Sequence, residues 1–346
     1  MRIRAWRIEL KKLTIALLCI ALCLSLCACT GVGNKTPDSF NITKGARQCY
    51  AVSGDNVITA TQSVFCVYDA EGNETVRTQC DLQYPTVAKS ENAAVIYDVG
   101  GTSVFFDDGS EITTDGMIIS ADLSESGKLA LCTEEAGYKA SVTVYDGLKA
   151  VYKWYSAENW VLDAAVSEDG ESLAVLCSGA DGAAIHMFEL TGEEEVGMLP
   201  VNESAANICW VDGNACSISD SGLSFCSRQG KDEGSFDFEG QSLGEYAVCD
   251  DFILLELREH SFGGPGMLVG VDENGRELSR EQLDAEIVGI DCGDAIAVQT
   301  QNEVIIFDDD MKMLAKAETA GAERVLLYKE GNVICLGAGI ANITDY

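Results

Sequence analysis

Cysteine is the residue type with the most chemistry to offer in this chain, which holds 15 cysteines among 346 residues. Paired cysteines can form disulfides, Cys/His clusters can bind zinc, and a single Cys can carry a lipid. No CxxC pair and no Cys/His cluster occurs, so we expect no zinc site. Five cysteines lie in apolar or alternating runs that predict strands, where Cys serves as a small hydrophobe: Cys66, Cys132, Cys177, Cys216 and Cys335.

One pair of cysteines is spaced for a possible disulfide. If Asp212-Gly213 forms a two-residue turn, Cys209 and Cys216 face each other across a β-hairpin. Directly opposed cysteines in a hairpin often have poor geometry for an S–S bond. Both alternatives stay open, a Cys209–Cys216 disulfide and two free thiols, and we favour the free thiols.

Acylation is the chemistry indicated for Cys29. Residues 1–12 carry five bases against one acid, and an uncharged apolar run of 16 residues follows, from Leu13 to Ala28. A basic flank before a short apolar run is typical of an export signal, and 16 residues is short of the ~20 that span a bilayer comfortably. The run ends in Leu26-Cys27-Ala28-Cys29, which resembles a bacterial lipobox, although Cys27 is unusual at its position.

We therefore predict a lipoprotein signal peptide over residues 1–28, a lipid-carrying Cys29 as the mature N-terminus, and a small, polar, Gly-rich tether over residues 29–37. The alternatives are an uncleaved membrane anchor and an ordinary cleaved signal. All three put the following domain, residues 38–346, on the outer face of the cytoplasmic membrane. Loss of the signal leaves 11 cysteines besides Cys29.

The other residues with chemical potential do not form a recognisable active site. His186 lies inside a predicted strand, His260 lies in a loop, and neither is near a nucleophile signature such as GxSxG. The acidic turn Asp308-Asp309-Asp310 lacks the alternating oxygen ligands of a calcium loop. We expect no catalytic residue, no cofactor and no metal, and therefore no enzyme.

The charge of the chain limits its partners. It has 56 acidic and 23 basic residues, a net charge of −33, and removal of five bases and one acid with the signal makes this −37. Nucleic-acid binding needs a basic face, so we exclude it. An anionic membrane leaflet repels such a domain, which favours a body held away from the membrane by its anchor and cationic partners.

The elements that position these residues follow from a repeat. From residue 47 onward helical periodicity is almost absent, and short alternating runs end in Tyr-Asp or a substitute followed by a turn. The last residues of this phrase recur every 36 to 45 residues, and Ser227 is the most degenerate copy: 69, 107, 146, 189, 227, 272 and 308. Four strands in ~40 residues is the spacing of β-propeller blades. Eight blades fit best and seven remain possible.

A second phrase and the chain ends complete the prediction. Turns of the type Ser167-Glu168-Asp169-Gly170 resemble those between the first two strands of a blade. An eighth copy of the Tyr-Asp phrase ends at Asp345, one residue before the chain stops, so the last blade lacks its fourth strand. Residues 38–43 alternate like a strand with no blade before them. We predict that they supply the missing strand and close the ring, which hides two sheet edges.

These phrases resemble a family of uncharacterised, membrane-anchored propeller proteins of clostridia and related Gram-positive bacteria. Its members read as a short anchor followed by WD-repeat-like or quinoprotein-like blades with "V-x-V-Y-D-x-x-G" and "S-x-D-G-x-x-L-A-V" phrases. The likeness covers residues 45–346, while many relatives have a longer membrane segment in place of the lipobox. The resemblance implies a fold and a location outside the membrane, and it implies no reaction.

Three function classes follow, in order of preference. The first is a monomeric, lipid-anchored interaction or scaffold module that binds another envelope protein, because propellers present loops around a rigid disc. The second is a sensor that binds a small molecule or glycan in the central channel. The third is an enzyme. A channel plugged by apolar side chains favours the first class, a pocket with converging polar groups the second, and a buried carboxylate with a perturbed pKa the third.

Overall fold

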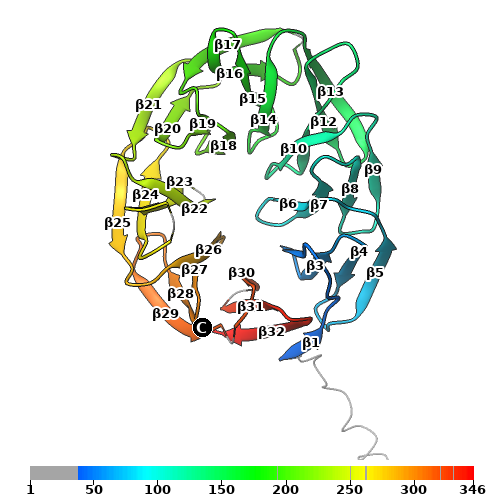
Figure 1. Ribbon diagram of the computed structural model, residues 1–346, viewed down its shortest axis with the longest axis vertical. Coiled ribbons are helices and arrows are strands. Elements are labelled where there is room, and N and C mark those ends of the chain that lie inside the picture. The colour runs from blue at the N-terminus through cyan, green and yellow to red at the C-terminus, as the bar shows by residue number, and fades with distance from the viewer. Residues whose placement is uncertain (1–37, 193, 250, 262, 320, 330) are drawn as a thin grey trace, which may run out of the picture. The chain divides into compact units, whose positions relative to one another are not determined.

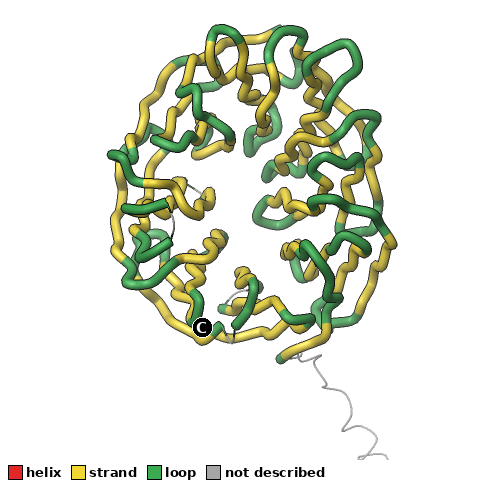
Figure 2. The backbone as a smooth tube through the Cα atoms, viewed as in Figure 1, coloured by secondary structure: helices red, strands yellow, loops and turns green. Residues whose placement is uncertain are grey.

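The computed structural model describes residues 38–346 except 193, 250, 262, 320 and 330. It contains 32 strands in eight four-stranded antiparallel sheets, set like blades around one axis (Figure 1). Strands and short loops alternate around the whole ring, and no helix occurs among the described residues (Figure 2). The predicted all-β propeller is therefore confirmed, with eight blades rather than seven.

Seven blades use four consecutive strands each, numbered here as blades 1 to 7. Blade 1 comprises β2 (Cys49–Ser53), β3 (Asn56–Ala60), β4 (Val64–Tyr68) and β5 (Glu74–Gln79), and blade 2 comprises β6 (Pro85–Lys89), β7 (Ala94–Asp98), β8 (Ser103–Phe106) and β9 (Glu111–Thr113). Blade 3 comprises β10 (Ile118–Leu123), β11 (Lys128–Thr133), β12 (Ala140–Asp146) and β13 (Lys149–Ser156), and blade 4 comprises β14 (Trp160–Val166), β15 (Ser172–Gly179), β16 (Gly182–Glu189) and β17 (Glu195–Val201).

Blades 5 to 7 repeat the same order from the axis outward. Blade 5 comprises β18 (Asn207–Val211), β19 (Asn214–Ile218), β20 (Gly222–Cys226) and β21 (Asp232–Asp237), and blade 6 comprises β22 (Ser242–Val248), β23 (Phe252–Arg258), β24 (Met267–Asp272) and β25 (Glu277–Gln282). Blade 7 comprises β26 (Ile287–Cys292), β27 (Ile296–Thr300), β28 (Glu303–Phe307) and β29 (Met313–Glu318).

Blade 8 joins the two ends of the described chain. It comprises β30 (Arg324–Leu327), β31 (Asn332–Gly337), β32 (Ile340–Asp345) and, outermost, β1 (Ser39–Asn41). Phe40 lies opposite Ala341 in this pairing, and the Ile42 N–H donates to the Gly339 carbonyl over 2.9 Å. The predicted closure by residues 38–43 is confirmed, and it leaves the third strand of the last blade with a partner on both edges.

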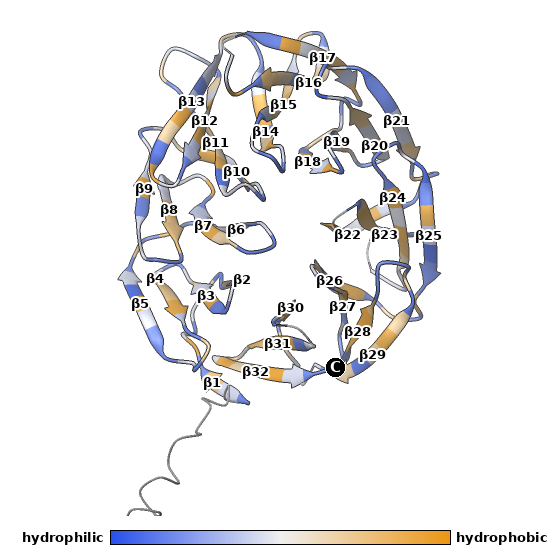
Figure 3. Cartoon of the chain, turned by 180° about the vertical axis from the view of Figure 1, so that it is seen from behind, coloured by the Kyte–Doolittle hydropathy of each residue, from blue (hydrophilic) through white to orange (hydrophobic). Residues whose placement is uncertain are grey.

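The hydrophobic core lies between the blades. Each of the eight clusters of buried apolar side chains joins two neighbouring blades. The middle strands, such as β4 and β7, are buried at every residue. Outer strands such as β5 contain exposed and half-buried residues in alternation, and β5 is mostly hydrophilic (Figure 3). A strand covered on both faces reads as a continuous apolar run, and a half-covered strand alternates, as the sequence does.

The repeated Asp after the third strand has a physical role in the turn to the fourth. The Asp69 carboxylate accepts the N–H of Asn73, and Asp272 and Asp308 accept the N–H four residues further on in the same way. Such side-chain acceptors stabilise tight turns. In the degenerate copy the hydroxyl of Ser227 accepts the Lys231 N–H over 3.2 Å, so Ser replaces Asp in the same bond. Blade 5 therefore counts as a complete blade.

Candidate functional site

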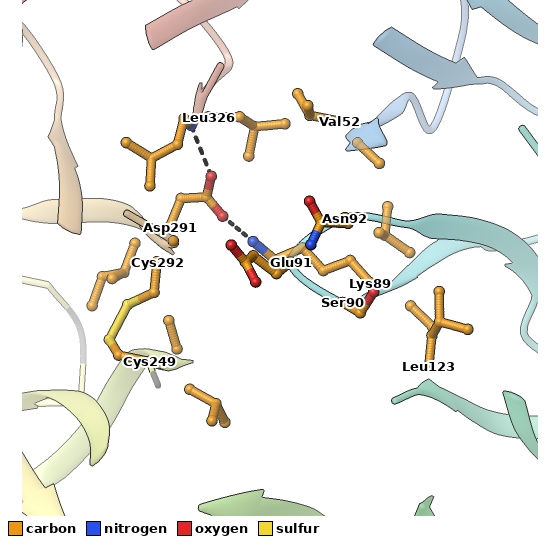
Figure 4. A pocket seen from close by; sticks show the side chains of 18 of the residues that line it. Val52, Lys89, Ser90, Glu91, Asn92, Leu123, Cys249, Asp291, Cys292 and Leu326 are labelled. Atoms are coloured by element: carbon orange, nitrogen blue, oxygen red, sulfur yellow. Dashed lines mark hydrogen bonds and ion pairs between the residues drawn. A yellow bond between two sulfur atoms is a disulfide. The ribbon is translucent and has the colours of Figure 1, made fainter. Parts of the chain in front are cut away.

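A cavity of 1820 Å³ occupies the centre of the propeller at one face of the ring. Its walls are residues of the first strands, and its rim is formed by the first turns, which connect the first and second strands of all eight blades. The channel is therefore not plugged by apolar side chains at this face. Polar groups converge on it from blades that lie far apart in the sequence (Figure 4).

Acidic residues form the rim of this cavity. Among the described residues, seven of the eight first turns contribute one exposed acid to the lining. We call these seven residues the acidic rim: Asp55, Glu91, Glu125, Glu168, Asp212, Asp251 and Asp294. The eighth turn contributes Lys329, whose Nζ lies 3.8 Å from Asp55 Oδ1.

Each rim acid is favoured locally because it lies in a tight turn. The acids form a ring because the propeller topology places all these turns on one face. Asp and Gly are favoured in tight turns, and the first turns of blades 1 and 5 are Gly54-Asp55 and Asp212-Gly213. Asp212 itself has φ 40°, in the left-handed region that Asp tolerates better than most residues. Eight equivalent turns in a closed propeller all face the same side, so single turn acids add up to one field.

Three aspartates in first strands each connect their own blade to the following blade, and we call them the bridging aspartates. Asp122 of blade 3 accepts the Val166 N–H over 3.3 Å. Asp163 of blade 4 accepts the Ile208 N–H over 3.0 Å. Asp291 of blade 7 accepts the Leu327 N–H over 2.8 Å. The first strand of each blade is an edge strand and pairs with only one other strand. Each of these bonds therefore satisfies a backbone N–H of the next blade's first strand.

One bridging aspartate also binds a cation that crosses the channel. Lys89 ends β6 in blade 2, and its Nζ forms an ion pair and hydrogen bond with Oδ1 of Asp291 in blade 7. Blades 8 and 1 separate these two blades around the ring. Figure 4 marks both interactions of Asp291, whose carboxyl is 6% exposed, while the Lys89 side chain lies in the cavity.

The other two bridging aspartates line the cavity without such a cation. Burial, followed by the charge of Asp163, raises the pKa of Asp122 to about 8. Burial raises the pKa of Asp163 to about 6, against the effect of the Ile208 N–H, the Ser120 hydroxyl and the Ala164 N–H. Burial first, and the Asp163 charge next, also raises the pKa of Tyr97, which lines the same wall.

Of the two alternatives for Cys209 and Cys216, the structure has the favoured one, free thiols. Cys209 and Cys216 lie opposite each other across the predicted hairpin, but both thiols are free. Cys209 Sγ lies 3.8 Å from Cys216 O, and Cys216 Sγ lies 3.9 Å from Ser217 O. Directly opposed cysteines in a hairpin often have poor geometry for an S–S bond. The five cysteines expected as small hydrophobes are all free and buried in strands.

A disulfide missed by the sequence analysis joins Cys249 of blade 6 to Cys292 of blade 7, with Cα atoms 5.2 Å apart. The two residues are 43 positions apart, about one blade repeat, and both follow or end a first strand. Equivalent positions in successive blades are neighbours at the channel wall. That equivalence is the sequence signal that would have found the pair.

The remaining expected residues lie outside the cavity or outside the described chain. His186 in β16 packs near Trp154, and its Nδ1 lies 2.8 Å from Glu195 Oε2. His260 is exposed in the loop after β23. No group of three His, Cys, Asp or Glu side chains suited to a metal occurs among the described residues. Cys29, the signal and the tether fall in residues 1–37, which the structure does not describe.

Sequence reasoning also missed the rim and the bridging aspartates. A usable signal existed for the latter, because Asp122, Asp163 and Asp291 each interrupt an otherwise apolar first strand. A buried acid in such a place needs partners. For Lys89 no signal existed, since nothing in the sequence relates residue 89 to residue 291.

Within the part of the chain that is described, no helix is long and apolar enough to cross a bilayer.

Comparison with known proteins gives a family and a fold. The sequence pattern of a family of unknown function, DUF5711, matches residues 33–325. No curated protein matches the chain in sequence. BamB from Moraxella catarrhalis has a similar fold, with a TM-score of 0.56, 14% identity, and coverage of 90% of this chain and 99% of that one. The C-terminal WD40 domain of Sif2 is similar at a TM-score of 0.59 and 11% identity, covering 89% of this chain and 95% of that one. Chaetomium thermophilum Sqt1 bound to the N-terminus of the ribosomal protein L10 is similar at a TM-score of 0.60 and 11% identity, covering 89% of this chain and 100% of that one.

Proposed function

The chain belongs to the DUF5711 family of unknown function, and we propose that it is a protein-interaction module of the cell envelope that binds a cationic segment of another envelope protein. The observation that carries the proposal is the acidic rim around the central cavity. We further propose that the module acts as a monomer, binds no nucleic acid and catalyses no reaction. The net charge of −33 supports the exclusion of nucleic acid.

The open channel with converging polar groups meets the criterion for a ligand-binding channel, but the size of the cavity favours a protein segment over a small ligand. Pockets that enclose drug-sized molecules measure ~300–1000 Å³, whereas this cavity measures 1820 Å³ and is open at one face. Sqt1, a propeller of similar fold, is known in a complex with the N-terminus of another protein. At 11% identity this likeness supports only what the fold allows, namely that a propeller can hold a terminal segment of a partner.

The electrostatics favour a cationic segment. Among the described residues of the first turns, the seven acids of the acidic rim face one cation, Lys329, which already lies near Asp55. Complementary charge speeds the encounter and selects against wrong partners more than it adds affinity. We therefore expect fast, salt-sensitive binding, with the affinity supplied by contacts inside the channel.

The perturbed aspartates do not by themselves favour an enzyme. Asp122 and Asp163 fulfil the criterion of carboxylates with raised pKa values, but both accept backbone N–H groups of the next blade and so have a structural role. A general acid or base also needs a nucleophile or water-positioning partner within reach. The two described histidines, His186 and His260, do not line the cavity.

Neutralising the acidic rim is expected to weaken binding of a cationic peptide. The probe is fluorescein-labelled nona-arginine, titrated by fluorescence anisotropy at about 50 and 300 mM NaCl, where screening differs strongly. The rim variant Asp212→Asn/Asp251→Asn/Asp294→Asn should bind several-fold more weakly than the wild type at low salt, and the difference should shrink at high salt.

The matched control removes the same number of charges from the outer strands. Glu233, Glu281 and Glu318 are exposed in β21, β25 and β29, and their triple Gln variant has the same net charge as the rim variant. This control should bind like the wild type. An equal loss in both variants would mean that the net charge, not the rim, attracts the peptide, and the proposal would fail.

We propose a lipid anchor at Cys29 as the means by which this module stays at the membrane. The support is the basic flank, the apolar run Leu13 to Ala28 and the Leu-Cys-Ala-Cys ending. Cys29→Ala should abolish incorporation of labelled palmitate and prevent removal of the signal, seen as a larger chain on a gel. Cys27→Ala is the control and should be processed normally. Normal labelling of Cys29→Ala would refute the anchor.

A further inference from the structure

We propose that Asp122 and Asp163, with Ser120 and Tyr97, form a subsite in the wall of the central channel that binds an organic cation, an ammonium or guanidinium group. Two sources share this chemistry, a Lys or Arg side chain of the partner segment and a free polyamine. For the first source, the inference rests on the proposed function, because the cationic segment at the rim would supply the side chain.

The template for the subsite is present in the same channel. All three bridging aspartates use one carboxylate oxygen to accept an N–H of the next blade. Asp291 uses its second oxygen to bind the Lys89 ammonium, which reaches it through the cavity. Lys89 therefore shows that a bridging aspartate of this channel can hold an amine cation while keeping its bond to the neighbouring blade.

The equivalent position at Asp122 is open. Its Oδ2 accepts the Val166 N–H at 3.3 Å, and among the described residues its Oδ1 has no hydrogen-bond donor. The cations that line the cavity are already engaged elsewhere: Lys89 with Asp291, Arg324 with Glu245 at 3.7 Å, and Lys329 with Asp55 at 3.8 Å. No cation of the described chain thus compensates the Asp122 and Asp163 side of the channel.

The electrostatic cost of placing the Asp122 and Asp163 carboxyls in the channel wall supports the binding of a cation there. Burial, followed by the charge of Asp163, raises the pKa of Asp122 to about 8, and burial raises the pKa of Asp163 to about 6. Charged groups in a poorly solvated wall are costly unless paired, and a cation with hydrogen-bond donors removes that cost. A bound ammonium or guanidinium would shift both carboxyls toward the ionised form.

The other groups at the site suit an organic cation better than a metal ion. The Ser120 hydroxyl is buried and lies close enough to Asp163 to lower the pKa of that carboxyl, although it completes no hydrogen bond of standard geometry among the described residues. Successive strand residues alternate, so Ser120 and Asp122 share the cavity face of β10. Tyr97 and Tyr246 line the same cavity and provide aromatic surface for a guanidinium or ammonium. A metal would need a third carboxylate, His or Cys ligand, and no such trio occurs in the described chain.

The test compares binding to the full mature protein and to two variants. The subsite variant is Asp122→Asn/Asp163→Asn, which keeps side-chain acceptors for Val166 and Ile208. The control is Asp98→Asn, because Asp98 is also buried, also accepts two backbone N–H groups, from Gln83 and Tyr84, and does not line the cavity. The probes are the labelled nona-arginine peptide and free spermidine, measured by anisotropy and by calorimetry.

We expect the subsite variant to bind nona-arginine at least about tenfold more weakly than the wild type, with Asp98→Asn unchanged. A parallel loss of spermidine binding indicates that a free polyamine is also a ligand, and loss with the peptide alone indicates a side chain as the source. Equal peptide affinity for wild type and subsite variant would overturn the subsite and leave the rim proposal standing. Absence of all binding to the wild type would overturn both.

A second measurement needs no variant. Binding a cation should release protons from the wild type near pH 7, seen as a dependence of the calorimetric enthalpy on the ionisation enthalpy of the buffer. The titratable groups that face Asp122 are Asp163, Glu125, Tyr97 and Cys132. Asp122 itself and Asp163 have pKa values near neutrality, about 8 and about 6. Binding without proton release would contradict the subsite.

Discussion

A chain that starts at residue 45 is expected to unfold at a much lower temperature than one that starts at residue 31, and to aggregate. The lost segment includes β1, the outer strand of blade 8, whose removal exposes the edge of β32. It also includes Ile42, which is 6% exposed, and Phe40, whose ring lies 5.9 Å from that of Tyr68 in blade 1. Each buried side chain contributes ~1.5–3 kcal/mol, against a total stability of ~5–15 kcal/mol.

Polar contacts make the same segment a connection between blades 8 and 1. The Thr43 N–H donates to the Tyr68 hydroxyl over 2.8 Å, and Arg77 donates to Thr43 Oγ1 over 3.0 Å. A chain that starts at residue 38 keeps all of these contacts and is the control. It should melt within a degree or two of the longer chain in scanning calorimetry. Equal melting temperatures for the chains starting at 31 and 45 would refute closure by β1.

Replacing Asp122 with Asn is expected to stabilise the protein at alkaline pH. The pKa of Asp122 in the folded chain is about 8, above the ~3.9 of an unfolded aspartate. The folded state therefore binds more protons between these values, so the contribution of Asp122 to stability is complete below pH ~4 and is lost as the pH rises to ~8. Asn stays neutral and keeps an acceptor for the Val166 N–H.

The free energy of unfolding of Asp122→Asn, measured by urea denaturation, should exceed that of the wild type by an amount that grows from pH 5 to pH 9, on the order of a few kcal/mol at the upper end. The comparison variant is Asp163→Asn. Because the pKa of Asp163 is about 6, its gain should level off by about pH 7. A constant difference between Asp122→Asn and the wild type across this range would mean that Asp122 titrates normally.

Much of the fold could be predicted because its causes are local. The Tyr-Asp phrase recurs since a side-chain acceptor is needed at each turn to a fourth strand, and Ser227 satisfies the same requirement as Asp69. The first-turn phrase recurs for a similar reason, with Gly127 and Gly170 at φ of 77° and 74°, where a residue with a Cβ is strained. The leftover strand at residues 38–43 predicted closure because an exposed sheet edge is costly.

The site was not predictable in the same way, because its residues come from different blades. Asp55, Asp212 and Asp294 each read as an ordinary turn residue, and only closure of the ring turns them into one rim. Cys209 and Cys216 are close in sequence and opposed in register, yet both are free thiols, whereas Cys249 and Cys292 form a disulfide across two blades. Lys89 and Asp291 are 202 residues apart.

The class of the fold, the positions of the turns and the closure of the ring could be inferred from the sequence, because strand alternation, turn chemistry and repeat spacing act over a few residues up to one blade. The folded arrangement was needed to establish which acids share a field, which cysteines bond and which buried aspartates have a cation. Those outcomes depend on distances between blades, and electrostatic and covalent partners are chosen by distance in space rather than along the chain.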